Sequence, residues 1–190
     1  MKKYLAPLGL TALIAGALMA FPLGASATVI TSPAVTVKGE SEGSITLHGI
    51  VDLTCSNSVL EGTLEQFGPS VTAKGAVSVL SFTECNQHLT TVASGTMELH
   101  ATSGGNGTLT SSGAKVTISF TTIFGTVHCV FATNNTLIGT LTGSKNTGGT
   151  ATVDLNSAPI PVESGSFLCG SSAELTGNYK ISTPDYVDVD

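Results

Sequence analysis

The stretch LTCSNSVLEGTLEQFGPSVTAKGAVSVLSFTECN, from Leu53 to Asn86, contains the pattern that decides the fold. It opens on Cys55, continues to a Gly-Thr-Leu triplet that begins at Gly62, and closes on Cys85. Valine and serine alternate shortly before the closing cysteine. Alternation with a period of two places one face of a strand toward a core, so the stretch predicts β-strands bounded by a cysteine pair.

A second segment repeats this order of residues. It opens on Cys129, has its Gly-Thr-Leu triplet at Gly139, and closes on Cys169. After each closing cysteine comes a strand-like run that begins with glycine, at Gly95 in the first segment and at Gly177 in the second. The repeat predicts two related half-modules within one domain.

The chain begins with a segment typical of a removable export signal. Lys2 and Lys3 precede an apolar run over residues 8–21, and small residues follow it up to Ala27. We predict that residues 1–27 are a signal peptide and that the mature chain begins at Thr28. No later segment is long and apolar enough to predict a transmembrane helix. We therefore expect a secreted protein, located at the cell surface, outside the cell or in a periplasm.

The charge of the chain excludes some classes of partner. There are seven lysines, no arginine and 13 acidic residues, for a formal net charge of −6. Removal of the signal peptide takes away two of the lysines and none of the acids. Proteins that bind nucleic acid or anionic lipid present clustered lysine and arginine, and this chain has no such cluster. We expect no nucleic-acid partner.

Threonine, serine, glycine and valine dominate the mature chain, which favours strands over helices. Clusters of glycine, asparagine and serine supply the turns between them. We expect an all-β protein: a single β-sandwich, Ig-like or jelly-roll-like, of about ten strands with two disulfides. The sandwich would span residues 39–183, after an extended N-terminal arm at 28–38 and before an acidic tail at 184–190. Strands are predicted near residues 34–38, 44–54, 58–67, 76–83, 92–101, 106–111, 114–124, 126–133, 136–142, 150–155 and 173–182.

Four cysteines in an exported chain indicate disulfides, because disulfides form and persist outside the cytosol. Four cysteines allow three connectivities. The repeat favours Cys55–Cys85 and Cys129–Cys169, since each half-module would then have its own bond. In the chain-entropy model each bond would stabilise the fold by about 3–4 kcal/mol.

A metal site is the competing interpretation of these cysteines. Cys85 and His88 lie three residues apart, and His128 precedes Cys129. Adjacent residues on a strand point to opposite faces, and the closely spaced cysteine pair typical of zinc sites is missing. We expect no metal or cofactor. The histidines are expected at surface or edge positions, with no acidic residue adjacent to His48 or His100; the four are His48, His88, His100 and His128.

The polar residues do not predict a catalytic site. The Gly-x-Ser-x-Gly pattern of hydrolases occurs at residues 39–43, but the helix that a nucleophile elbow needs after its serine is not expected there. Ser164, Ser171 and Ser172 are expected in turns. Glu61 and Glu65 would share one strand face, but the chain has few aromatic residues on which a sugar could stack. The aspartates of the tail do not have EF-hand spacing. We expect no catalytic residue.

The N-terminal arm suggests a mode of assembly. Residues 28–38 alternate valine with threonine and could complete a neighbour's sheet by strand addition. They could equally pair within their own sandwich or remain unpaired. The leading hypothesis is an exported, non-enzymatic surface or extracellular-matrix protein with a structural or adhesive role. Its partners would be identical subunits or a cell-surface molecule.

Three stretches resemble segments of small exported bacterial β-proteins of uncharacterised function. They are residues 53–86, GTVHCVFATNNTLIGTLTGS at 125–144, and GSFLCGSSAELTGNYKISTP at 165–184. The chain is more loosely similar, in size, export and Gly/Thr/Val composition, to the family of the secreted protein activator of alkane oxidation. That resemblance implies an extracellular accessory role at hydrophobic substrates, and it transfers no site residue.

Two alternative functions follow. The first is a secreted accessory protein that binds a lipid or an alkane, which would need an enclosed apolar pocket on the order of several hundred Å³. The second is an uncharacterised hydrolase, which would need polar side chains that converge in space. The sequence shows neither feature directly.

Overall fold

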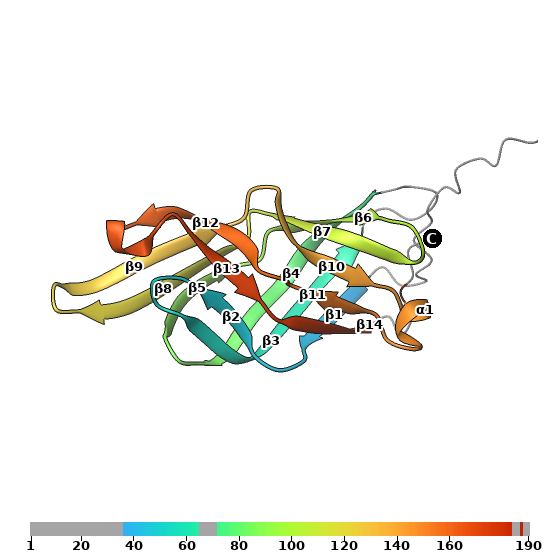
Figure 1. Ribbon diagram of the computed structural model, residues 1–190, viewed down its shortest axis with the longest axis horizontal. Coiled ribbons are helices and arrows are strands. Elements are labelled where there is room, and N and C mark those ends of the chain that lie inside the picture. Colours follow the sequence, from blue (N-terminus) through green and yellow to red (C-terminus); the bar gives the residue numbers. More distant parts are fainter. Residues whose placement is uncertain (1–35, 65–71, 184–186, 188–190) are drawn as a thin grey trace, which may run out of the picture.

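The computed structural model describes residues 36–64, 72–183 and 187 of the 190-residue chain, as fourteen strands and two short helices (Figure 1). The elements are β1 (Thr36–Ser41), β2 (Ile45–His48), β3 (Leu53–Leu64), β4 (Thr72–Cys85), β5 (His88–Ala93), β6 (Thr96–Ala101), β7 (Asn106–Ser112), β8 (Lys115–Thr122), β9 (Gly125–Ala132), β10 (Thr136–Thr142), α1 (Ser144–Thr147), β11 (Thr152–Asp154), β12 (Ala158–Gly165), η1 (Phe167–Cys169), β13 (Ser172–Thr176) and β14 (Asn178–Thr183). The protein is all-β, as the sequence predicts.

Eight of the strands close into a barrel. Their order is β1, β14, β11, β10, β7, β6, β4 and β3, and β3 pairs again with β1. All of these pairings are antiparallel. Strand β1 completes the circle because it pairs with β14 on one side and with β3 on the other. Closure leaves none of these eight strands with an open edge inside the barrel wall.

The other six strands form an extension that begins at the barrel. Strand β2 pairs with the first residues of β3, and β13 pairs with β2. Strand β12 pairs with β13 through residues 158–161 and with β9 through residues 162–165. Strand β8 pairs with β9, and β5 pairs with β8. We call β12, β9, β8 and β5 the extension sheet; in Figure 1 it projects to the left of the barrel and ends in the β8–β9 hairpin.

The junction between barrel and extension sheet is fixed by hydrogen bonds around Thr133. The chain leaves the barrel from β7 into β8 and returns from β9 into β10. The Thr133 N–H donates to the Ala114 carbonyl at 2.9 Å, and the Thr133 carbonyl accepts from the Gly113 N–H at 2.8 Å. The Thr133 hydroxyl lies 3.0 Å from the buried Ser111 hydroxyl. The extension sheet is therefore continuous with the barrel wall.

The expected two-sheet sandwich of about ten strands is not what forms. The structure has fourteen strands, and eight of them close on themselves. Two predicted strands, 92–101 and 173–182, are each interrupted at a glycine with positive φ, Gly95 (71°) and Gly177 (140°). The sequence prediction also missed β12, whose Pro159 and Pro161 argue against a strand. Strand β12 tolerates them because residues 158–161 pair with β13 on one side, while pairing with β9 on the other side begins at Val162.

Alternate side chains of the barrel strands point inward. In β4, Ala73, Gly75 and Val77 are buried while the residues between them are exposed. Buried residues of the other strands continue this core; they include Ile45, Leu53, Leu99, Ile138, Leu141, Val153, Leu155, Tyr179 and Ile181. The period-two alternation expected from the sequence thus defines the interior of the barrel.

The glycines of the two Gly-Thr-Leu triplets lie where the backbone of a neighbouring strand leaves no room for a side chain. Register shifts occur between Glu61 and Gly62 in β3, and between Leu137 and Gly139 in β10. A Cβ atom on Gly62 would lie 2.6 Å from the Ala76 carbonyl oxygen, and one on Gly139 would overlap the carbonyl of Asp154. The repeated triplet therefore marks two points at which only glycine leaves room for the adjacent backbone.

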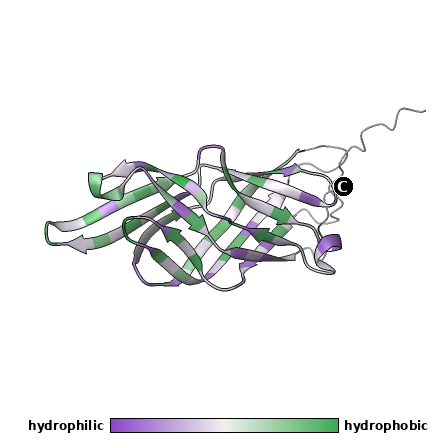
Figure 2. Ribbon diagram, in the orientation of Figure 1, coloured by the Kyte–Doolittle hydropathy of each residue, from purple (hydrophilic) through white to green (hydrophobic). Residues whose placement is uncertain are grey.

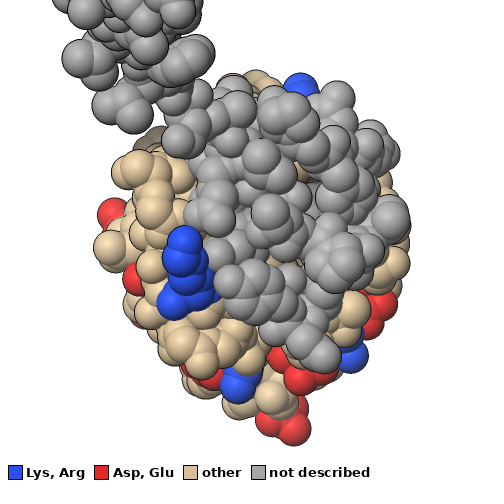
Figure 3. All heavy atoms as spheres, turned by 90° about the vertical axis from the view of Figure 1, so that its right-hand side faces the viewer, with Lys and Arg blue, Asp and Glu red and all other residues tan. Residues whose placement is uncertain are grey.

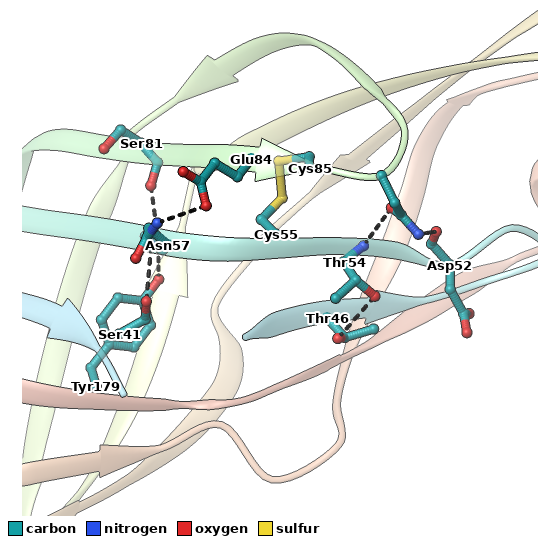
Figure 4. Close-up of a disulfide and its surroundings, with 12 residues drawn as sticks. Ser41, Thr46, Asp52, Thr54, Cys55, Asn57, Ser81, Glu84, Cys85 and Tyr179 are labelled. Atoms are coloured by element: carbon teal, nitrogen blue, oxygen red, sulfur yellow. Dashed lines mark hydrogen bonds between the residues drawn. A yellow bond between two sulfur atoms is a disulfide. The ribbon is translucent and has the colours of Figure 1, made fainter. Parts of the chain in front are cut away.

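Disulfides join Cys55 to Cys85 and Cys129 to Cys169. The first links directly opposed residues of β3 and β4 (Figure 4). The second ties η1 to β9 of the extension sheet. The half-modules are not structurally equivalent. Cys55 and the first triplet share β3, whereas Cys129 lies on β9 and the second triplet on β10.

The two ends of the chain are only partly within the described residues. The predicted signal peptide and residues 28–35 of the expected arm lie outside them, whereas Thr36–Lys38 begin β1. Of the acidic tail, only Val187 is described. It is buried, and its N–H donates to the Ser144 hydroxyl at 2.8 Å, while its carbonyl accepts from the Ser144 N–H at 2.7 Å.

Candidate binding site

The barrel contains a partly open cavity of about 180 Å³. Inward-facing side chains of the barrel strands make up most of its wall, and residues of β2, β8, β9, β12 and β13 also contribute. Aliphatic and aromatic side chains predominate; six of them are Leu53, Phe82, Met97, Leu99, Phe131 and Val153. The cavity is therefore lined almost entirely by hydrocarbon, because alternation turns the apolar face of every barrel strand toward it.

The buried polar groups of the wall already have partners. The Ser111 and Thr133 hydroxyls hydrogen-bond to each other at 3.0 Å. The Tyr179 hydroxyl lies 2.6 Å from the Ser58 hydroxyl. Ser58 donates its own proton to the Ser81 carbonyl at 2.8 Å, so the Tyr179 hydroxyl must be the donor in its bond to Ser58. The hydroxyls of the wall residues Ser111, Thr133 and Tyr179 therefore need no hydrogen bond from a ligand.

Tyr179 is uncharged at ordinary pH. Burial raises the pKa of its hydroxyl to about 12. The phenol therefore stays neutral, and no ionised group among the described residues lines the cavity. An apolar, uncharged interior favours an apolar, uncharged occupant, since a buried polar group without a partner costs about 1–3 kcal/mol.

The size of the cavity restricts the occupant. Apolar cavities of roughly 150 Å³ lined by Leu, Ile and Phe stay dry and take up benzene-sized molecules, whereas sites for drug-sized ligands measure about 300–1,000 Å³. The 180 Å³ of the barrel is therefore enough for a short hydrocarbon or a single aromatic ring. It is smaller than the pocket that the lipid or alkane hypothesis assumed.

His48 and His100 each lie near an acidic side chain. His48 Nδ1 lies 3.3 Å from Asp52 Oδ2, and His100 Nε2 lies 3.6 Å from Glu98 Oε2, both with partly exposed side chains. The fold thus gives each an acidic neighbour that is not adjacent in sequence. The side chain of His88 lies outside the described residues. Within the described part of the chain, no three His, Cys, Asp or Glu residues are placed to share a metal ion.

A serine and a histidine do meet on the extension sheet. Ser119 and His128 face each other across β8 and β9, and Ser119 Oγ lies 2.7 Å from His128 Nδ1. A hydrolase would need a third group to orient the histidine and a substrate pocket beside the serine. Neither residue lines the barrel cavity, and no carboxylate is hydrogen-bonded to His128 in the regions described. The pair has the geometry of a cross-strand hydrogen bond.

The remaining candidate residues are dispersed on the surface. Glu61 lies 3.7 Å from Lys38 on the neighbouring β1, whereas Glu65 is outside the described residues. Ser164, Ser171 and Ser172 are exposed, but Ser164 lies in β12 and Ser172 begins β13, so the expectation that all three lie in turns is wrong. The aspartates of the tail are also outside the described residues. The barrel cavity, which no single sequence motif predicts, is the site that brings distant residues together.

Comparisons of the chain with protein-family models, with curated proteins and with solved structures found no match. None of the helices in the described regions has the length and apolar character needed to cross a membrane.

Proposed function

We propose that this protein is a non-enzymatic binding protein whose barrel takes up a small apolar molecule, either a short hydrocarbon or a single-ring aromatic compound. The observation that carries the proposal is the cavity of about 180 Å³ with its hydrocarbon wall. Protein interiors are normally packed to the density of organic crystals, with few voids larger than a water molecule. A void of this size removes contacts that a ligand could restore.

The compartment is part of the same proposal. The predicted signal peptide and the two disulfides are typical of proteins that work outside the cytosol. A secreted protein of this kind would hold an apolar compound that dissolves poorly in water. The looser resemblance to the alkane-oxidation activator family agrees with such an accessory role.

The test is whether apolar molecules stabilise the mature, oxidised protein. A ligand that binds only the folded state raises the unfolding free energy by RT ln(1 + [L]/Kd), which is about 2.7 kcal/mol at one hundred times Kd. We expect benzene and n-hexane near their solubility limits to raise the midpoint of thermal unfolding, and equal concentrations of methanol to leave it unchanged. No shift with either hydrocarbon would contradict the proposal.

A structural or adhesive role is the second candidate, and one observation favours it. Strand β5 pairs only with β8, so its other edge has no strand partner among the described residues. An open edge can pair with a second copy. Residues 36–41 are less suited to strand donation, because β1 already pairs on both sides within its own barrel. Light scattering of the mature protein tests self-assembly through this edge, and monomers at all concentrations would exclude it.

A further inference from the structure

The end of the molecule opposite α1 bears its most exposed apolar side chains. Among the described residues, the three most exposed large hydrophobic residues are Ile123, Phe167 and Phe124, at 92, 89 and 87%. Ile123 and Phe124 form the two-residue turn between β8 and β9, and Phe167 begins η1. Figure 2 shows hydrophobic colour at the hairpin tip and on η1, which lie at the same end. We call Ile123, Phe124 and Phe167 the apolar tip.

The hairpin holds its two apolar side chains outward. Strands β8 and β9 remain paired up to the last residues before the turn, Thr122 and Gly125. The Thr122 hydroxyl accepts from the Phe124 N–H at 3.1 Å and donates to the Gly125 carbonyl at 3.0 Å. Turns of this length normally use asparagine, aspartate or glycine. The backbone therefore gives no reason for isoleucine and phenylalanine at these positions.

The third side chain is held beside the hairpin by a covalent bond. The Cys129–Cys169 disulfide ties η1 to β9, and the Ser166 hydroxyl caps η1 by accepting from the Leu168 N–H at 3.3 Å. Apolar residues lie around this disulfide; Ile50, Phe120, Phe131 and Leu168 line one small void with it. Phe167 is thus attached to a packed base, and a preorganised tip loses less entropy on binding than a loose one.

Charge is missing from this end. No Asp, Glu, Lys or Arg occurs in residues 116–131 or in residues 164–173. The Lys115–Glu163 ion pair, with Lys115 Nζ 2.7 Å from Glu163 Oε2, lies at the base of the hairpin, where Lys115 faces Ala132. At the opposite end, side chains of both charges are visible (Figure 3). An uncharged apolar tip complements a neutral partner.

We propose that the apolar tip inserts into the surface of a neutral lipid layer, the interface of a zwitterionic bilayer. A protruding tip of three side chains suits a deformable layer. It is too small and too convex for a stable pair of identical tips, because specific protein interfaces bury about 1,200–2,000 Å². Because residues 116–131 and 164–173 contain no lysine or arginine, anionic headgroups would add no attraction to the tip. Insertion of the tip is independent of the proposed ligand in the barrel.

The experiment uses the absence of tryptophan from the chain. Phe124→Trp places a single tryptophan at the tip, and Leu137→Trp places one at an exposed site on β10 as the control. With phosphatidylcholine vesicles, we expect the emission of the Phe124→Trp protein to shift to shorter wavelength and to be quenched by brominated lipid, while the control stays unchanged. A concentration-dependent shift without vesicles would mean that copies of the protein pair through the tip, and would overturn the proposal.

Sedimentation with the same vesicles gives a second readout. We expect the Ile123→Ser/Phe124→Ser double variant to bind at least about tenfold more weakly than the unmodified protein, and Leu137→Ser to bind equally well. Both variants should unfold at the same temperature as the unmodified protein, because the replaced side chains are exposed. Equal binding by the double variant, or binding that requires phosphatidylserine, would overturn the proposal. A variant with a filled barrel, Val153→Phe, should still bind vesicles, which separates this proposal from the proposed function.

Discussion

The hydroxyls of Ser58 and Tyr179, 121 residues apart in the sequence, lie 2.6 Å apart in the barrel wall. Ser58 is on β3 and Tyr179 on β14, and β1 lies between these two strands in the barrel. Because Ser58 donates its hydroxyl proton to the Ser81 carbonyl of β4, Tyr179 must donate to Ser58. The Ser58 N–H also donates to the Ser41 hydroxyl of β1 at 2.9 Å. This chain of hydrogen bonds therefore connects four strands of the barrel wall: β14, β3, β4 and β1.

The direction of this chain predicts unequal costs for its two ends. Ser58→Ala removes the acceptor and leaves the Tyr179 hydroxyl buried without a partner, so we expect a loss of about 1–3 kcal/mol in unfolding free energy. Tyr179→Phe removes the donor and leaves the Ser58–Ser81 bond in place, so we expect about 0.5–1.5 kcal/mol. Urea unfolding of both variants measures this. A larger loss for Tyr179→Phe than for Ser58→Ala would contradict the assigned direction.

Tyr179 also predicts a pH dependence of stability. The pKa of its hydroxyl is raised from 10.0 to about 12 by burial. Below pH 10 the hydroxyl is protonated in both the folded and the unfolded chain, so it causes no change of the unfolding free energy with pH. Between pH 10 and 12 only the unfolded chain releases the proton, so the unfolding free energy falls by roughly 1.4 kcal/mol per pH unit. Urea unfolding of the unmodified protein and of Tyr179→Phe on either side of pH 10 measures this dependence. If the unfolding free energy fell equally with pH in both proteins, the burial of the phenol would be contradicted.

Val153 tests whether the cavity is the binding site. This buried residue of β11 lines the cavity. Val153→Phe should occupy part of the space and weaken benzene binding by at least about tenfold, at a stability cost of no more than about 1–3 kcal/mol. Val153→Ala should enlarge the space, cost about 1–3 kcal/mol and keep the binding. Thermal unfolding with and without benzene measures both effects. If benzene stabilised the two variants equally, its binding site would lie elsewhere.

The triplet glycines predict a stability loss that depends on the neighbouring backbone. An added methyl group at Gly62 or Gly139 meets the carbonyl of a paired strand, so Gly62→Ala and Gly139→Ala should each cost about 1–3 kcal/mol. Gly149→Ala is the matched control, because nothing lies within 4 Å of its added carbon, and it should change stability by less than about 0.5 kcal/mol. Chemical unfolding compares the three. A neutral Gly62→Ala would mean that β3 and β4 separate at little cost.

Parts of the fold could be predicted because their signals are local. Alternation along β4 and β8 depends only on neighbouring residues, and the two cysteine segments stand out as a repeat. Strand β12 could not be predicted, because Pro159 and Pro161 are unusual in a strand. Its pairing partners are β13, which follows it in the sequence, and β9, which precedes it. The apolar tip was not predicted from the sequence. Ile123-Phe124 lies inside the predicted strand 114–124, and only the turn placed there by the structure shows that it is exposed.

The sequence by itself determined the all-β class, the alternation that makes one face of each strand apolar, and the positions of the cysteines and turn glycines. Each of these follows from residues a few positions apart. The tertiary structure decided that the strands close into a barrel instead of stacking as two sheets. Closure depends on Thr36–Ser41 fitting between β3 and β14. It pairs residues 19 to 27 positions apart in β1 and β3, and residues 138 to 145 positions apart in β1 and β14. The cavity follows from closure, because its volume is what remains when side chains from distant strands meet at the barrel axis.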